Sequence, residues 1–327
     1  MMRLPLPLLS LCLAGLLPVT TLCADAPPIL PADAKLEQLW NEGEFTEGAA
    51  LGPEGSIYFS DIADVKVGKV YKFDPRTGKT TVHCPDSQKS NGLVFDAQGR
   101  LLAACGANAG ARAIVEITKD GKVNPLVEKF DGKRFNAPND IDVHPRGWVY
   151  VSDPFYVGKE PLELDQMSVY LWKPTDNSVT RVTTDITKPN GVAVSPDGKT
   201  LYVAETNNGK PLLGNSEFAA WRMTLNAFPI QDDGSLGQRR IVVDFGQSAG
   251  IDGMCVDKAG RIFAAIRNEK RFGIAVFDLS TGKELAFVPT PELPTNCCFG
   301  GGDDRQTLYI TAGKGFYRIR TAVAGPN

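Results

Sequence analysis

The sequence has little histidine, and its cysteines follow no metal-binding or disulfide pattern. Only two histidines and seven cysteines occur among 327 residues. No C-x-x-C pair or Cys/His cluster suggests zinc, and Cys12 and Cys23 lie in an N-terminal segment that we expect to be removed. The five that remain are odd in number, so disulfides are not expected to define the fold.

Basic runs and long apolar stretches are also scarce. The formal net charge is −3 and the basic residues are scattered, so the electrostatic footprint of a nucleic-acid-binding protein is absent. The apolar stretch at residues 8–19 follows Arg3 and has the length of a signal peptide, too short for a membrane span. We therefore expect residues 1–26 to be a signal peptide and the mature protein to be periplasmic or secreted, without a membrane span. The alternative is a buried helix of a cytosolic protein.

What the sequence does contain is a hairpin unit that occurs six times. In residues 188–203 (KPNGVAVSPDGKTLYV) a polar residue and a glycine precede an alternating strand, a turn and a second strand. An acidic residue or an asparagine opens every unit, and we call these six residues the openers: Glu47, Asn91, Asn139, Asn190, Asp252 and Asn296. Consecutive openers are about 44 to 62 residues apart, near the repeat length of propeller blades.

This repeat predicts an all-β, six-bladed β-propeller with four-stranded blades, in one domain that spans residues 34–327. Such repeats bury their faces only against their neighbours, so the ring must close. We expect the N-terminal strand, within residues 34–40, to pair with residues 316–320 of the last blade, because this removes an exposed edge. Residues 27–33 are rich in proline and are expected to be a tether.

Propeller geometry predicts where the openers lie. The first strand of each blade lines the central channel, so openers at the start of these strands converge at one mouth. The turns of Pro-Asp-Gly type then lie at the other mouth, and the ends of the second strands, including Arg267, return to the openers. Tyr156, in an insertion at residues 155–166, and a second insertion at residues 207–217 are expected to roof a pocket there.

Four openers carry the oxygen atoms that hard cations prefer. Glu47 and Asp252 supply carboxylates, and Asn139 and Asn190 supply amide carbonyls, a mixed set that calcium accepts. Without a cation the two carboxylates would repel each other. Zinc and copper favour nitrogen and sulfur ligands, so calcium is the expected metal, with zinc, manganese or magnesium left open. Asn-Gly and Asp-Gly are also ordinary turn signals, and a purely structural role of the openers is the alternative.

The mature chain resembles the gluconolactonase, senescence-marker-protein (regucalcin) and luciferin-regenerating-enzyme family, in particular its bacterial gluconolactonases. The resemblance depends on the order and spacing of short segments: residues 47–48, 133–140 (KRFNAPND), 152–154, 189–191, 195–202 (SPDGKTLY), 252–254 and 307–311. It implies a six-bladed propeller that binds one divalent metal, usually calcium, at the channel mouth and hydrolyses lactones.

Residue by residue, the resemblance implies that Glu47, Asn190 and Asp252 are metal ligands. Asn139 matches a residue that binds metal or substrate, depending on the member. Ala137 stands where animal regucalcins place a substrate-contacting arginine, whereas Arg134 fits the bacterial pattern, so the sugar-acid specificity stays open.

We expect a lactone such as gluconolactone to be opened by a cation that polarises the carbonyl and by water that a carboxylate or the metal activates. His83 ends an outer strand and His144 lies near the far turn, so Ser-His-Asp chemistry is not expected. We therefore assign Asp252 to ligation and general-base work, and Asp140 to orienting the substrate or Asn139. The expected substrate-binding residues are Asn91, Asn139, Arg134, Asn296 and Tyr156.

Two other functions stay open. Related six-bladed propellers use a similar Glu/Asn/Asn/Asp calcium site to hydrolyse phosphotriesters. A non-catalytic binding propeller, in contrast, would use the openers only as turns. The sequence leaves the oligomeric state and the natural substrate open as well.

Overall fold

A computed structural model describes residues 28–62, 67–209, 213–214 and 222–326. The expected signal peptide and part of the expected insertion at residues 207–217 lie outside these ranges. Within them, no helix is long and apolar enough to cross a membrane.

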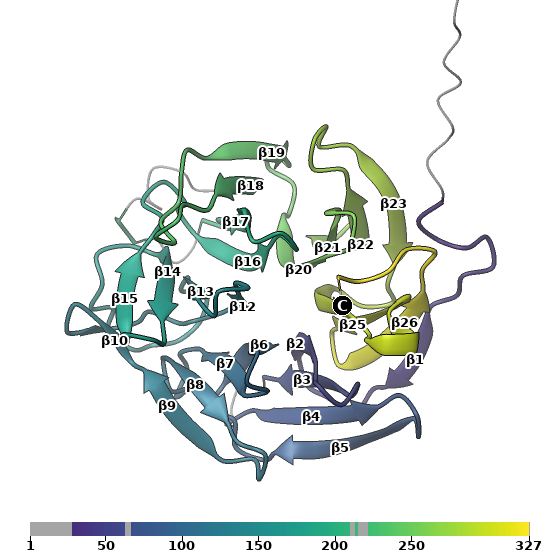
Figure 1. Ribbon diagram of the computed structural model, residues 1–327, viewed down its shortest axis with the longest axis horizontal. Coiled ribbons are helices and arrows are strands. Elements are labelled where there is room, and N and C mark those ends of the chain that lie inside the picture. Colours follow the sequence, from purple (N-terminus) through teal and green to yellow (C-terminus); the bar gives the residue numbers. More distant parts are fainter. Residues whose placement is uncertain (1–27, 63–66, 210–212, 215–221, 327) are drawn as a thin grey trace, which may run out of the picture.

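Six four-stranded antiparallel sheets are arranged as blades around a central channel (Figure 1). The prediction of a six-bladed propeller with four-stranded blades is therefore confirmed. The strands of blades one to three are β2 (Thr46–Leu51), β3 (Ile57–Asp61), β4 (Lys69–Asp74), β5 (Lys79–Cys84), β6 (Ser90–Phe95), β7 (Leu101–Cys105), β8 (Ala113–Ile117), β9 (Val123–Val127), β12 (Ile141–Val143), β13 (Val149–Asp153), β14 (Ser168–Lys173) and β15 (Ser178–Arg181).

The remaining three blades follow the same order from the channel outward. Their strands are β16 (Pro189–Val194), β17 (Thr200–Thr206), β18 (Met223–Pro229), β19 (Arg240–Asp244), β20 (Ile251–Val256), β21 (Ile262–Asn268), β22 (Arg271–Phe277), β23 (Glu284–Pro289), β24 (Pro294–Phe299), β25 (Thr307–Ala312), β26 (Gly315–Arg320) and β1 (Glu37–Trp40). A small hairpin, β10 (Lys129–Phe130) and β11 (Lys133–Arg134), lies between blades two and three, and a 3-10 helix, η2 (Gly302–Asp304), precedes β25.

The N-terminal strand closes the ring. β1 pairs antiparallel with β26, with Glu37 opposite Arg318 and Gln38 opposite Tyr317. The predicted pairing is thus confirmed, and it places the earliest described strand on the outside of the last blade. Ile29, in the segment expected to be a tether, is buried in the core of the last two blades, and its carbonyl accepts a hydrogen bond from Ala322.

The core lies between the blades, because each sheet buries both of its faces. On β21, Phe263 and Ala265 pack toward blade six, whereas Ala264 and Ile266 pack toward blade four. This alternation follows from the period of two along a strand. Since both faces are covered, apolar residues follow one another along the inner strands, and polar residues gather at the strand ends.

Candidate active site

The openers lie where the first strand of a blade departs from regular pairing. The pairing register shifts at the opener in five of the six blades, for example between Glu47 and Ala50 and between Ile251 and Met254. A β-bulge of this kind re-aims a side chain and is common next to active sites. In blade three the opener Asn139 precedes the regular strand, and its amide donates to the carbonyl of Ser152.

Neighbouring openers are packed against one another. A Cβ atom on Gly48, which has a φ of +51°, would lie 1.9 Å from the carbonyl oxygen of Asn91. The amide of Gly92 donates to the carbonyl of Asn139 at 2.7 Å, and a Cβ on Gly191 would lie 2.5 Å from the carbonyl oxygen of Asp252. Glycine therefore follows these openers because the next blade approaches too closely for a side chain.

Two carboxylates connect blades three and four, and one of them, Asp140, stands directly after its opener, where other blades have a glycine. Asp140 Oδ2 accepts a hydrogen bond from the Val192 amide at 2.9 Å, and Asp142 Oδ2 accepts one from the Val194 amide at 2.7 Å. Burial raises the pKa of Asp140 to about 7, although the hydrogen bond from Val192 lowers it. Asp140 was predicted from the sequence as a site residue, whereas Asp142 was missed, although its period-two spacing from Asp140 was an available signal.

Glu47 and Asp252 belong to one electrostatic group at this mouth. Both are buried, with 4% and 5% of their surface exposed. Burial, followed by the negative charge of Asp252, raises the pKa of Glu47 well above its ordinary value, and the positive charge of Arg267 lowers it. Arg267 donates from Nη1 to Asp252 Oδ2. The sequence placed Arg267 on this face without a role, and its ion pair became visible only in the structure.

Asn190 completes a set of hard oxygen atoms. Its side chain interacts with the Tyr156 hydroxyl, which itself donates to the carbonyl of Thr206 at 3.0 Å. Its Oδ1 atom is buried and has no hydrogen-bond partner among the described residues. A buried carbonyl oxygen without a partner is costly. Together with the carboxylates of Glu47 and Asp252, this orphaned oxygen fits a divalent oxygen-liganded cation.

The candidate centre combines carboxylate oxygens with an amide oxygen, and contains no third acidic, histidine or cysteine ligand among the described residues. In the part of the chain that the structure describes, no group of three or more His, Cys, Asp and Glu residues could hold a metal ion. Two carboxylates and one amide carbonyl are therefore available at the mouth, with the partly exposed Asn139 on the neighbouring blade as a further candidate.

The other predicted substrate-binding residues are placed unequally. Asn91 is partly exposed and Asn296 is buried, and both lie in the ring of openers, where Asn296 Oδ1 accepts from the Cys297 amide. Arg134, in contrast, lies on β11, where its guanidinium donates to the carbonyl of Ala111 and its amide donates to Glu163. Its described contacts thus involve none of the openers.

Asp153 holds the segment that leads into Asn139. Its carboxylate accepts hydrogen bonds from the amides of Asn136 at 2.9 Å and Ala137 at 2.7 Å. Burial raises the pKa of this fully buried carboxyl to about 7. Asp153 therefore fixes the backbone of the segment that precedes Asn139.

Neither histidine reaches the openers. His144 Nε2 is 2.8 Å from the carbonyl oxygen of Gly198, at the turn-side mouth, and the ring stacks on Trp148. His83 packs edge-on against Tyr58. Residues 246–250 do match the G-x-S-x-G pattern of serine hydrolases, but they form an exposed connection between β19 and β20, rather than a strand-to-helix elbow.

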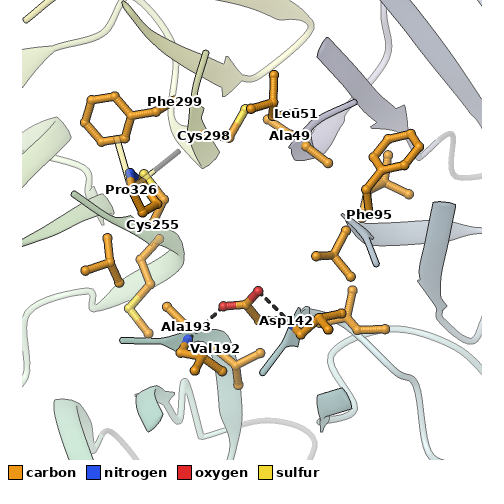
Figure 2. Close-up of a pocket in the computed structure, with 18 of the residues that line it drawn as sticks. Ala49, Leu51, Phe95, Asp142, Val192, Ala193, Cys255, Cys298, Phe299 and Pro326 are labelled. Atoms are coloured by element: carbon orange, nitrogen blue, oxygen red, sulfur yellow. Dashed lines mark hydrogen bonds between the residues drawn. The ribbon is translucent and has the colours of Figure 1, made fainter. Parts of the chain in front are cut away.

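A cavity of about 460 Å³ occupies the channel below the openers. It extends from Asp140 and Asn296 to His144 and Ser195 on the turn side. Figure 2 shows the carboxylate of Asp142 projecting into it, opposite apolar and sulfur-containing side chains of the other blades. Polar side chains line the cavity at both ends, with Asp140 and Asn296 near the openers and His144 and Ser195 near the turns.

Comparison with known proteins gives a consistent result. The sequence profile of the SMP-30/Gluconolactonase/LRE-like region matches residues 45–314. A gluconolactonase of Zymomonas mobilis is 27% identical over 319 residues, covering 91% of this chain and 84% of that protein. A pentonolactonase of Haloferax volcanii is 26% identical over 273 residues, covering 80% and 81%. The solved structure of a gluconolactonase of Xanthomonas campestris is 30% identical, with a TM-score of 0.75 and coverage of 91% and 96%.

Proposed function

The chain belongs to the SMP-30/Gluconolactonase/LRE-like family, and from that premise we propose that it is a divalent-metal-dependent hydrolase of sugar lactones. Its relatives with assigned substrates include a gluconolactonase and a pentonolactonase. A five- or six-carbon aldonolactone is therefore the proposed substrate class, and calcium is the proposed metal.

The observation that carries this proposal is the convergence of Glu47, Asn190 and Asp252 at one mouth. The first and last of these share an electrostatic group, and the amide oxygen of Asn190 is buried without a partner among the described residues. These three residues would hold the cation, with Asn139 as a further ligand or as a substrate contact. A bound divalent cation would supply Lewis-acid polarisation of the lactone carbonyl.

The remaining roles belong to side chains of the chain itself. Asp252 is the proposed general base that takes a proton from the attacking water, in addition to its proposed role as a ligand of the cation. Asp140, held by the Val192 amide, orients the substrate or Asn139. Asn91 and Asn296 are proposed to donate hydrogen bonds to the sugar hydroxyls, and Tyr156 to cover the substrate.

The test is turnover by the purified full-length mature chain with glucono-1,5-lactone, a pentonolactone and the phosphotriester paraoxon, each with calcium and with chelator. Lactone opening that needs the metal supports the proposal. Paraoxon turnover without lactone turnover would move the assignment to a phosphotriesterase, and a protein inactive on all three would favour a binding propeller.

We also propose that the protein is exported, on the pattern of residues 1–26. Cell fractionation of the producing organism or of a bacterial host tests this. The mature N-terminus, read by mass spectrometry, should begin close to residue 27 in the periplasmic or secreted fraction, and an intact N-terminus found only in the cytosol would contradict export.

A further inference from the structure

We propose that Arg267 is a built-in counter-ion of the metal site, which neutralises the mouth when no cation is bound and which an incoming cation must displace. This inference rests on the proposed metal site of Glu47, Asn190 and Asp252, and it assigns to the chain a device that sets the affinity of that site.

The contacts of Arg267 place its charge within the proposed ligand set. Its side chain extends from the end of β21, and Nη1 donates to Asp252 Oδ2. The side chain of Asp252 is only 7% exposed, so little water competes for this bond. Arg267 also acts electrostatically on Glu47. One guanidinium thus offsets negative charge at both acidic openers.

The charge balance at the mouth determines how a cation can bind. Glu47 and Asp252 carry two negative charges when ionised, and Arg267 offsets one of them. The neighbouring Asp140 belongs to the same electrostatic group, but burial raises its pKa to about 7, so below that pH it adds little negative charge. A divalent cation alone would neutralise the pair, whereas a cation together with Arg267 leaves an excess positive charge in a partly buried mouth. Like charges at such distances repel strongly when they are shielded from water. Arg267 must therefore weaken cation binding unless it moves away.

The structure offers Arg267 a place outside the ligand set. Its side chain is 28% exposed, and its guanidinium carbon lies 5.6 Å from the centre of the Phe45 ring. A cation held over an aromatic face keeps favourable electrostatics without a carboxylate. In the proposed displaced state the guanidinium leaves Asp252 and stays over Phe45, a change in side-chain bonds rather than in the strand.

Arg271 provides a matched control on the same hairpin. It lies on the adjoining strand β22, where it pairs with Glu284 and stacks over Phe287 at 3.7 Å. It therefore has the same kinds of partner as Arg267, a carboxylate and an aromatic ring. Its side chain is 53% exposed, and none of its described contacts involves an opener.

The experiment compares calcium binding by wild type, Arg267→Gln, Arg267→Lys and Arg271→Gln, measured by isothermal titration calorimetry. Removal of the charge at residue 267 should tighten the dissociation constant at least about tenfold, given the repulsion of charges a few ångströms apart. Arg267→Lys, which keeps the charge, and Arg271→Gln should both remain near the wild-type value. An Arg267→Gln constant equal to or weaker than that of wild type overturns the inference.

A second measurement covers the case in which Arg267→Gln does not fold. In ¹⁵N-labelled wild type, calcium should shift the Nε–H resonance of Arg267 and leave that of Arg271 in place, and an unmoved Arg267 resonance under saturating calcium overturns the inference. Lactone turnover in chelator distinguishes this failure from failure of the proposed function. If lactone turnover needs calcium but the Arg267 resonance does not shift, the proposed function holds and the counter-ion inference is wrong.

Discussion

The Oδ2 atom of Asp140 accepts a hydrogen bond of 2.9 Å from the backbone amide of Val192, in the neighbouring blade. At the corresponding place in four other blades stands a glycine, packed against the next opener. Asp140 is therefore both a residue of the candidate site and a tie between blades three and four, and its two roles need separate measurements.

Asp140→Ala should lower both stability and turnover. Loss of the carboxylate leaves the buried Val192 amide without its partner, at a cost of about 1–3 kcal/mol, as measured by denaturant unfolding. Asp142→Ala is the control, because Asp142 ties Val194 in the same way but lies deeper in the channel. It should lose similar stability and keep its lactone turnover. Equal loss of turnover in both variants would show that Asp140 only connects the two blades and has no role at the site.

Asp252→Ala should abolish lactone turnover even at saturating calcium, because it removes the proposed base together with a ligand. A loss of at least about a hundredfold in kcat is expected for a general base. Glu284→Ala, which removes a partly exposed ion-pair partner in the same blade, serves as the control and should retain turnover. Wild-type turnover by Asp252→Ala would refute the assignment.

Calcium should stabilise the protein through the openers. At a hundredfold excess over the dissociation constant, the free energy of unfolding should rise by about 3 kcal/mol, seen as a calcium-dependent melting temperature that chelator reverses. Asn190→Ala removes the orphaned amide oxygen and should weaken calcium binding at least about tenfold. If wild type melts at the same temperature with calcium and with chelator, the proposed metal site is contradicted.

Stability should depend on pH through Asp153. The folded-state pKa of this carboxyl is raised to about 7, above its value in the unfolded chain. The stabilisation that the protonated Asp153 carboxyl gives to the folded state is therefore fully present below about pH 4, and it is lost as the pH rises through about 7. Between these values wild type should lose up to about 4 kcal/mol relative to Asp153→Asn, at 1.36 kcal/mol per pKa unit. Denaturant unfolding at several pH values measures the difference, and a pH-independent difference would be inconsistent with it.

Deletion of residues 34–42 should open the ring. β26 would lose its partner β1, and the exposed strand edge should cause aggregation or a loss of cooperative unfolding. Gel filtration and a thermal melt measure these effects, with the exposed Glu37→Ala as a control that leaves the backbone pairing in place. An unchanged melting temperature of the deletion variant would contradict the prediction that β1 stabilises the propeller by closing the ring.

Much of the fold was predictable because a repeat of this length and pattern determines how the blades are arranged. Six hairpins with polar openers fix the number of blades and place the openers at one mouth, and the strand of residues 37–40 has its partner in the last blade. Side-chain pairing was not predictable in the same way. Nothing in the sequence shows that Arg267 turns to Asp252, or that Arg134 turns to Ala111. Those directions depend on local rotamers and neighbours rather than on repeat spacing.

The pairing of β1 with β26 also constrains the order of events during synthesis. β1 leaves the ribosome long before β26, and the last blade has no complete sheet until both strands are present. A nascent chain interrupted before residue 315 has its first strand unpaired and its channel open on one side. A product that terminates before β26 therefore cannot close the ring, and its unpaired strand edge makes it a substrate for proteases or chaperones.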